Sequence, residues 1–281
     1  MSVLVVTGTG TGVGKTVVTA AIAALARARG QDVAVIKPAQ TGVMPGEPGD
    51  LDEVRRLAGP VSLHELARFA AALSPEAAAR VGGSVPADLR EAARYAAKLA
   101  GSASRCPPNQ TLLRSPLADA RCDAPTGAQR RQQHSGGHLT DGRLVLIEGA
   151  GGLAVRYDPA GTTLADLAAI LGAPVLVVTA AGLGTLNHTA LTLEALAARG
   201  LSRAGVVIGC WPAQPDLAMR CNVTDLQTLS GGPLAGALPE GAGALEAGSF
   251  LSAARAGLSP ALGGTFDPAE FEQLNDWQEA Q

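Results

Sequence analysis

The sequence predicts an α/β protein with a single, doubly wound and mostly parallel sheet, helices on both faces and one irregular insertion. Short apolar runs of strand length alternate with alanine-rich segments of helical periodicity along its 281 residues. Residues 8–16 form a glycine-rich turn of the phosphate-binding type between the first strand and the first helix. Hydrophobic residues make up 47% of the chain, but aromatic residues make up only 3%. We therefore expect a core of Ala, Val, Leu and Ile, which suits helices packed on a parallel sheet.

Each predicted element rests on its own stretch of sequence. Continuous apolar runs predict strands at 3–7, 33–36, 144–147, 175–179 and 206–208, with a weaker strand at 234–238. Apolar residues at helical spacing predict helices at 16–29, 51–57, 87–100, 164–171 and 187–199. We assign residues 1–241 to one domain with an insertion at 101–142, and residues 242–281 to a C-terminal extension.

Residues 8–16, the P-loop, read Gly-Thr-Gly-Thr-Gly-Val-Gly-Lys-Thr. Glycines let several backbone N–H groups point at one anion, and the N-terminus of the following helix adds positive potential. Lys15 is expected against the β- and γ-phosphates of a nucleotide, and the Thr16 hydroxyl on a magnesium ion. The common spacing of such loops places glycine at position 9, where this chain has Thr9. The alternative is a glycine-rich hairpin turn that happens to contain a lysine.

A second lysine closes the strand predicted at 33–36. Residues 36–42 read Ile-Lys-Pro-Ala-Gln-Thr-Gly, so Lys37 stands at the C-terminal edge of a parallel strand and faces the same crevice as the P-loop. Taken alone, Lys37 is more simply interpreted as an exposed lysine that ends a strand. Together with Lys15, it would place two cations where phosphate charge must be held.

A carboxylate closes the strand predicted at 144–147. Residues 144–152 read Leu-Val-Leu-Ile-Glu-Gly-Ala-Gly-Gly, and Glu148 takes the place of the more usual Asp on the second magnesium-handling strand of P-loop proteins. A carboxylate there coordinates magnesium directly or through water. Asp50, in a Gly- and Pro-rich loop before the helix at 51–57, is a candidate third ligand. A helix N-cap is an equal alternative for Asp50.

Residues 183–189, after the strand at 175–179, read Leu-Gly-Thr-Leu-Asn-His-Thr. Asn187 and the hydroxyls of Thr185 and Thr189 are either helix-cap residues or substrate contacts. The lone His188 is of a kind that is more often structural than catalytic.

The composition narrows the possible partners and compartment. The net charge is −3 and no basic cluster extends beyond short Arg pairs, so we expect no nucleic-acid partner. The 4 cysteines form no C-x-x-C pair, which argues against a zinc site or a disulfide framework. The first strand begins at residue 3, leaving no room for a signal sequence, and no apolar run approaches the length of a bilayer span. We expect a cytoplasmic protein that makes no membrane contact.

Residues 101–142 do not follow the strand and helix pattern, since they show neither periodicity and contain no Val or Ile. A structureless loop of this length is unusual inside a compact domain. Either it is an irregular surface insertion, or it is translated in a shifted reading frame that later returns to frame. The bias toward Arg, Pro, Cys, Gln and Ser slightly favours the second explanation. We assign no function to its histidines or cysteines.

We predict that a short Gly/Ser linker can replace residues 101–142 while solubility is preserved or improved. Natural α/β loops make such a crossing in roughly 2–6 residues, and this composition cannot bury enough apolar surface to offset the entropy of ordering it. Soluble yield and nucleotide binding of the linker variant measure this. Loss of folding, or a packed interface formed by Leu112, Leu113 and Leu117, would contradict it.

Four motifs together carry a family resemblance. In order they are Gly-Thr-x-Thr-Gly-Val-Gly-Lys-Thr, Lys-Pro-x-Gln-Thr-Gly, Glu-Gly-Ala-Gly-Gly and Leu-Gly-x-x-Asn-His-Thr. The chain closely resembles dethiobiotin synthetases over residues 1–100 and 143–241, not over 101–142, and weakly after Gly241. The resemblance implies an enzyme of biotin synthesis that closes a cyclic urea from 7,8-diaminononanoate and carbon dioxide, using ATP and Mg²⁺, and that works as a homodimer.

The resemblance also implies roles for individual residues. Lys37 and Lys15 would be catalytic, with Lys37 steadying a carbamate and the transferring phosphoryl group. Magnesium ligands would be Thr16, Asp50 and Glu148. Substrate-binding residues would be Thr41, Gly184, Thr185, Leu186 and Asn187, the last four reaching across the dimer. Nucleotide-binding residues would be Gly12, Val13, Gly14, Lys15, Thr16, Val17, Glu148, Gly149, Ala150, Gly151, Gly209, Cys210, Pro239, Glu240 and Gly241.

One departure from the family concerns the nucleotide base. Many members have Asn-Asp after the strand equivalent to 206–208, where the Asn binds adenine, but this chain has Gly209-Cys210. The use of nucleotides other than ATP is therefore an open alternative. Two alternatives to an active synthetase remain: a regulatory P-loop ATPase of the partition type, and an inactive copy of the synthetase. Partition ATPases usually carry a second lysine near the start of the loop, where this chain has Thr7-Gly8-Thr9.

Overall fold

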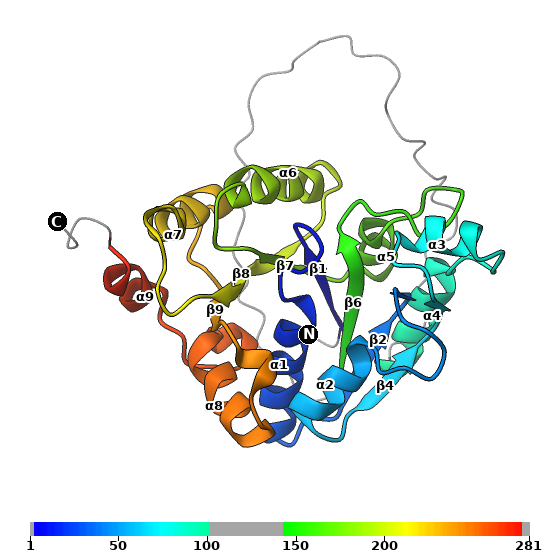
Figure 1. Cartoon of the computed structure of the whole chain (residues 1–281), viewed down its shortest axis with the longest axis horizontal. Helices are drawn as coiled ribbons and strands as arrows, with labels where there is room; N and C mark the ends of the chain where they lie inside the picture. The colour runs from blue at the N-terminus through cyan, green and yellow to red at the C-terminus, as the bar shows by residue number, and fades with distance from the viewer. Residues whose placement is uncertain (1–2, 102–142, 277–281) are drawn as a thin grey trace, which may run out of the picture.

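A computed structural model describes residues 3–101 and 143–276. Its main sheet contains seven parallel strands in the spatial order β4-β2-β6-β1-β7-β8-β9 (Figure 1). They are β1 (Val3–Gly8), β2 (Val33–Lys37), β4 (Ser62–Glu65), β6 (Leu144–Gly152), β7 (Val175–Thr179), β8 (Arg203–Trp211) and β9 (Gly236–Pro239). The short strands β3 (Gln40–Thr41) and β5 (Arg68–Phe69) form a small sheet of their own. The predicted parallel, doubly wound sheet is confirmed.

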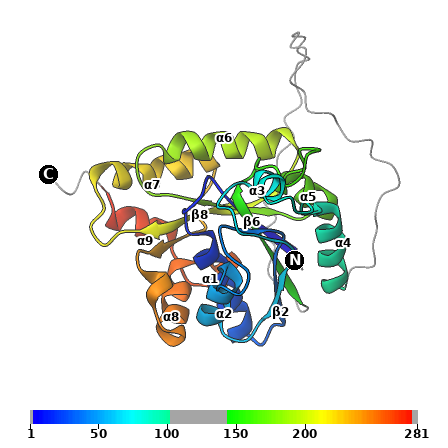
Figure 2. The ribbon, with the colours of Figure 1, turned by 45° about the vertical axis from the view of Figure 1, so that its right-hand side comes forward.

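Helices cover both faces of this sheet. They are α1 (Lys15–Ala28), α2 (Asp50–Ala58), α3 (Pro75–Val81), α4 (Leu89–Leu99), α5 (Leu164–Leu171), α6 (Thr185–Ala198), α7 (Leu217–Ser230), α8 (Ala247–Gly257) and α9 (Pro268–Leu274), with 3₁₀ turns at Ala242–Ala244 and Pro260–Leu262. Figures 1 and 2 both show α1, α2 and α8 on one face, and α4, α5, α6 and α7 on the other. All five predicted helices are present, with ends that differ by two residues at most.

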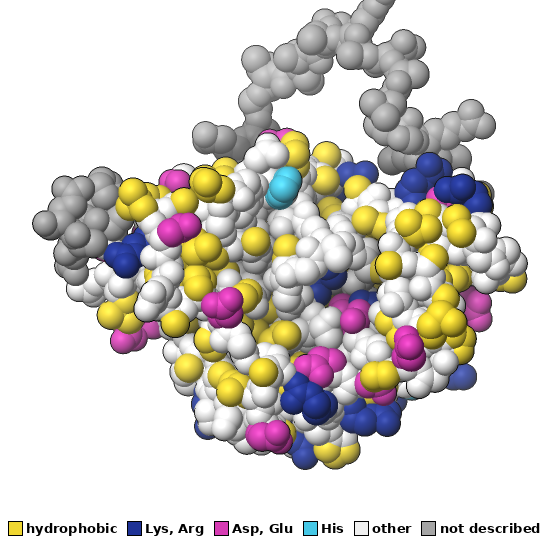
Figure 3. Space-filling model, in the orientation of Figure 1, with side chains coloured by type: hydrophobic (Ala, Val, Ile, Leu, Met, Phe, Trp, Pro, Cys, Tyr) yellow, Lys and Arg dark blue, Asp and Glu magenta, His cyan; other side chains and the backbone are white. Residues whose placement is uncertain are grey.

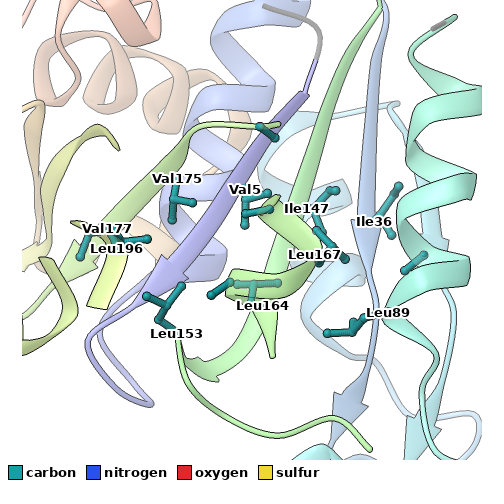
Figure 4. Close-up of a cluster of buried hydrophobic side chains, with 14 of the residues drawn as sticks. Val5, Ile36, Leu89, Ile147, Leu153, Leu164, Leu167, Val175, Val177 and Leu196 are labelled. Atoms are coloured by element: carbon teal, nitrogen blue, oxygen red, sulfur yellow. The ribbon is translucent and has the colours of Figure 1, made fainter. Parts of the chain in front are cut away.

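The alternation of side chains along the strands divides the core into two layers. On β1, Leu4 and Val6 join the layer under α1, α2 and α8, while Val5 joins the layer under α4, α5 and α6. Figure 4 shows the second layer, in which Val5 and Ile147 lie beside Leu164 and Leu167 of α5. Because strand side chains point to opposite faces in turn, continuously apolar strands are what two buried faces require.

Several elements were not predicted, for identifiable reasons. The edge strand β4 has the sequence Ser-Leu-His-Glu and is only half-buried, so it lacks an apolar run. Helix α7 buries Asn222 and Ser230 beside Val223 and Leu226, so polar residues interrupt its apolar periodicity. The predicted insertion at 101–142 lies outside the described residues except for Gly101, and so do Leu112, Leu113 and Leu117. The helix before it ends at Leu99 and the strand after it begins at Leu144, as expected.

A segment after residue 241 packs onto the sheet. Phe250 and Ala254 of α8, with Leu258 beyond it, are fully buried in the layer that contains α1. Gly236 at the start of β9 bridges to Leu258, joining this segment to the sheet edge. Within 3–101 and 143–276, no helix combines the length and the hydrophobicity needed to cross a bilayer.

Candidate active site

The P-loop connects β1 to α1 at the carboxyl end of the sheet, and its backbone packs tightly against β8. Gly14 is the N-cap of α1 with φ +93°. A Cβ atom at Gly14 would lie 2.6 Å from the carbonyl oxygen of Gly209, and one at Gly209 would overlap the carbonyl oxygen of Val13. Glycine is required at both positions, because a side chain at either would push the loop away from the strand. Gly209 therefore supports the P-loop backbone.

Lys15 begins α1 with its side chain inside the loop. The residue is buried, and its ammonium donates a hydrogen bond to the carbonyl oxygen of Gly10 at 2.9 Å. Burial and, next, the positive charge of Lys37 lower the pKa of Lys15 to about 8. An anion bound in the loop would raise that pKa again, so phosphate and a charged Lys15 stabilise each other.

Lys37 ends β2 and is 2% exposed. Its Nζ lies 2.5 Å from Oδ2 of Asp50, 2.7 Å from Oε1 of Glu148 and 3.3 Å from the carbonyl oxygen of Gly149. Burial alone would lower the pKa of Lys37, but the charges and hydrogen bonds of Glu148 and Asp50 outweigh it and raise that pKa above its usual value. Lys37 is therefore a permanent cation held between two carboxylates.

Glu148 lies on β6, opposite Val6 of β1, and is fully buried. Its Oε1 accepts hydrogen bonds from Thr16 Oγ1 at 2.9 Å and from Lys37. Its Oε2 has no hydrogen-bond partner among the described residues. The Thr16 hydroxyl contacts Glu148 directly, and Asp50 binds the same lysine as Glu148. Together with this Oε2 of Glu148, these groups form an oxygen donor set of the kind that magnesium prefers.

Asp50 is the first residue of α2, and Gly49 is the N-cap, so the helix-cap alternative for Asp50 is wrong. The capping carboxylate is that of Asp52, which accepts from the Gly49 N–H at 2.8 Å. The Asp50 N–H donates to Oε1 of the buried Gln40 at 3.0 Å. This leaves the Asp50 carboxylate, 35% exposed, directed at Lys37.

The sequence-predicted core of the site is thus brought together: Thr16, Lys37, Asp50 and Glu148 are joined by hydrogen bonds and ion pairs, with Lys15 close enough to feel their charge. Figure 3 shows positive and negative side chains next to each other in the middle of the face that Figure 1 presents. Gly12, Val13 and Val17 belong to the loop and the first turn of α1, and Gly149, Ala150 and Gly151 continue β6 beyond Glu148.

The residues predicted to bind the nucleotide base lie at the ends of neighbouring strands. Cys210 is exposed near the end of β8, and Pro239, Glu240 and Gly241 end or follow β9. The Glu240 N–H donates to the Trp211 carbonyl oxygen at 2.7 Å. Next along the chain, a Cβ at Gly243 would lie 3.3 Å from Val17, which places this segment beside the start of α1.

The residues predicted to bind substrate divide into two groups. Thr41 is half-buried on β3, four residues after Lys37. Gly184 is the N-cap of α6, Thr185 is buried, Leu186 is half-buried, and Asn187 and His188 are exposed. Among the described residues, no hydrogen bond joins Asn187 to the cluster around Glu148.

Two supporting residues were not assigned a role from the sequence. Tyr157 is fully buried and its hydroxyl accepts a hydrogen bond from the Ala150 N–H at 2.7 Å, which fixes the backbone after Glu148. Gln40 holds the N–H of Asp50. Gln40 lies inside a motif but carries no charge, and Tyr157 lies in a loop, so neither position has a signal in a single sequence.

Comparisons with known proteins agree with this geometry. The family model described as AAA domain matches residues 2–100 and 86–244. ATP-dependent dethiobiotin synthetase BioD of Frankia casuarinae (strain DSM 45818 / CECT 9043 / HFP020203 / CcI3) is 56% identical over 96% of this chain and 98% of its own length. The proteins of the same name from Parafrankia sp. (strain EAN1pec), 54% identical, and Streptomyces coelicolor (strain ATCC BAA-471 / A3(2) / M145), 50% identical, cover 97% and 96% of this chain and 98% of their own lengths. The P-loop, Lys37 and the two carboxylates form one cluster, and these relatives are 50–56% identical over almost the whole chain. The chain therefore belongs to the ATP-dependent dethiobiotin synthetase family.

Proposed function

We propose that this chain is an ATP-dependent dethiobiotin synthetase that uses Mg²⁺ and closes the ureido ring of dethiobiotin from 7,8-diaminononanoate and carbon dioxide. The observation that carries the proposal is the buried Lys37, held between Asp50 and Glu148 beside the P-loop. A reaction that builds negative charge on a carbamate and on a transferring phosphoryl group needs a fixed cation at this place.

The proposed reaction has three steps. One substrate amine adds to the carbon of carbon dioxide and loses a proton, giving a carbamate. A carbamate oxygen attacks the γ-phosphorus and ADP leaves. The second amine then attacks the carbonyl carbon and loses a proton, phosphate leaves with the C–O electron pair, and the ring closes. Lys15 would hold the β- and γ-phosphates, and Lys37 would offset the charge of the carbamate and of the phosphoryl group in flight.

The magnesium site would consist of Thr16, Asp50 and Glu148. All three offer hard oxygen ligands, and Oε2 of Glu148, which no described residue hydrogen-bonds, supports this assignment. When bound with the nucleotide, the metal would neutralise phosphate oxygens. Lys37 now occupies the position between Asp50 and Glu148 and keeps these two carboxylates from repelling each other.

A homodimer that works in the cytoplasm completes the proposal. Leu183, Leu191, Leu217 and Leu229 are exposed apolar side chains on α6, on α7 and in the turn before α6. Such a concentration on one pair of helices supports burial against a second copy. Gly184, Thr185, Leu186 and Asn187 would then hold the substrate chain across the dimer, with Thr41 contacting the reacting end.

The two alternative functions are not favoured. Neither a partition-type regulatory ATPase nor an inactive copy fits as well with relatives that are about 50% identical and named as synthetases. A partner-driven ATPase also has no evident need for a lysine buried between two carboxylates on the strand next to β6.

We predict that Asp50→Asn raises the magnesium concentration needed for half-maximal rate, because it removes a hard anionic oxygen. The matched control is Asp52→Asn, which loses the same charge two residues away but only weakens the helix cap. A magnesium titration of the rate measures both. An unchanged requirement in Asp50→Asn would remove Asp50 from the ligand set.

We predict that the nucleotide base is recognised weakly. Gly209 has no side chain and packs against the P-loop, so no bidentate partner for adenine stands there. Discrimination between ATP and CTP or GTP should therefore be modest. Competition measurements test this, and a preference for ATP of several hundredfold or more would show that another residue binds the base.

The proposed function is tested by phosphate release. The purified protein with ATP and Mg²⁺ should release phosphate only when diaminononanoate and bicarbonate are both present. Phosphate release that is the same with and without diaminononanoate would indicate a simple ATPase and would overturn the proposal.

A further inference from the structure

Three threonine hydroxyls surround a fourth, that of Thr179, where the P-loop, β7 and α6 meet, and the proposed mechanism does not use Thr179. Thr179 ends β7 and is fully buried. Its Oγ1 lies 2.6 Å from that of Thr185, 2.8 Å from that of Thr189 and 3.4 Å from that of Thr9. Thr9 belongs to the P-loop, while Thr185 and Thr189 belong to the first turns of α6. A single hydroxyl therefore contacts both the loop and the helix.

The hydrogen count fixes the direction of these bonds. Each hydroxyl has one hydrogen to donate and two lone pairs. Thr185 donates its hydrogen to the carbonyl oxygen of Ala180 at 2.6 Å, so in its bond with Thr179 it must accept. Thr179 thus donates its own hydrogen to Thr185 and accepts from Thr189 and, more weakly, from Thr9. Among the described residues, Thr179 is the side chain that donates to Thr185, and a residue without a hydroxyl cannot replace it.

The turn between β7 and α6 is held on its other side as well. Nδ2 of the buried Asn222 on α7 donates to the carbonyl oxygens of Ala181 at 2.7 Å and Gly182 at 3.3 Å. With the bond from Thr185 to Ala180, three successive carbonyls of the turn are bound by side chains. On the P-loop side, the Thr9 N–H donates to the Val178 carbonyl oxygen at 2.9 Å. Hydrogen bonds therefore hold the turn on both sides, and the Thr179 side chain contacts both the start of α6 and the P-loop.

We propose that Thr179 is a positioning residue that fixes the β7–α6 turn relative to the P-loop of its own subunit, and so fixes the diamine substrate that this turn holds at the partner subunit's P-loop. This inference rests on the proposed function, in which the P-loop of one subunit holds the phosphates and residues 184–187 of the other subunit hold the substrate chain. In-line attack on the γ-phosphorus requires the two ligands in register, and a misplacement of about 1 Å can cost about a hundredfold in rate.

The first test is a comparison of steady-state constants. Thr179→Val keeps the shape of the side chain and removes the hydroxyl, while Thr179→Ser keeps the hydroxyl. The valine variant should raise KM for diaminononanoate about tenfold, the usual cost of a lost buried partner, with an ATP dissociation constant within about twofold of wild type. The serine variant should restore KM. Thr192→Val on the same helix, which loses only a bond to the His188 carbonyl oxygen, is the matched control and should leave KM unchanged.

The second test does not depend on the reaction. Binding of a non-hydrolysable ATP analogue should slow amide hydrogen exchange in residues 182–189 of the wild type, and this protection should be absent in Thr179→Val. If the wild type makes no dethiobiotin, the proposed function fails while the exchange experiment still decides the link through Thr179. If the valine variant does not fold, Thr179→Ala carries the same test. A hydroxyl-free variant that only melts at a lower temperature, with KM and exchange like the wild type, would overturn the proposal.

Discussion

Replacing Lys37 by Gln or Ala should abolish most turnover while leaving nucleotide binding nearly intact. Lys37 lies on β2, away from the P-loop backbone that binds phosphate, and its ammonium faces the position of the transferring group. Loss of one cation aimed at a transition state costs about 10²–10³ in rate. The rate of dethiobiotin formation and the calorimetric ATP affinity, measured on the same preparations, test this prediction.

The matched control is Lys98→Gln, at an exposed position on α4. Lys98→Gln removes the same charge at a position outside the cluster that Lys37 forms with Asp50 and Glu148, so it should keep the wild-type rate. Because Lys37 neutralises the buried Glu148, the Lys37 variants must also be shown to be folded, by circular dichroism, before their rates are compared. Near wild-type turnover in a folded Lys37→Gln variant would remove Lys37 from the mechanism.

Glu148→Gln should raise the magnesium concentration for half-maximal rate by more than about tenfold. Even the loss of a residue that only hydrogen-bonds a metal ligand costs roughly 10–100-fold in metal affinity. The amide keeps the volume and can still accept from Thr16, but it loses the charge that a divalent cation needs. A magnesium titration of the rate measures the change.

Glu65→Gln is the control for Glu148. Glu65 ends the edge strand β4, which pairs with β2, and it binds Arg68 rather than the cluster. Its amide variant should therefore keep the wild-type magnesium requirement. If Glu148→Gln and Glu65→Gln need the same magnesium concentration for half-maximal rate, Glu148 is a structural partner of Lys37 and not a metal ligand.

The sequence predicted those parts of the fold that obey a simple period. Strands buried on both faces are continuously apolar and were found from their sequence. Val175–Thr179 has both ends as predicted, whereas β6 and β8 extend several residues beyond the apolar runs that predicted them. Helix α7 and strand β4 were missed because tertiary contacts stabilise them in spite of their sequence. In α7, the polar Asn222 is buried because it binds two carbonyls of a distant turn, which no local pattern can indicate.

The charged residues of the site could be predicted for a related reason. Lys37 and Glu148 each follow the apolar run of a parallel strand, and parallel strands bring their carboxyl ends to one edge. The partnership of Lys37 with Asp50, at 2.5 Å, was not predictable, because the loop between them sets that contact. The threonines around Thr179 come from three separate segments and carry no charge, so only their packing identifies them.

The most direct test of the central claim is to follow the carbon of bicarbonate into product. The protein would be incubated with ATP, Mg²⁺, diaminononanoate and ¹³C-bicarbonate, and the product analysed by mass spectrometry beside Lys37→Gln. The account predicts dethiobiotin that carries one heavy carbon in its ureido ring, formed by the wild type and nearly absent with the variant. ATP hydrolysis without labelled dethiobiotin, or equal labelling by wild type and variant, would contradict it.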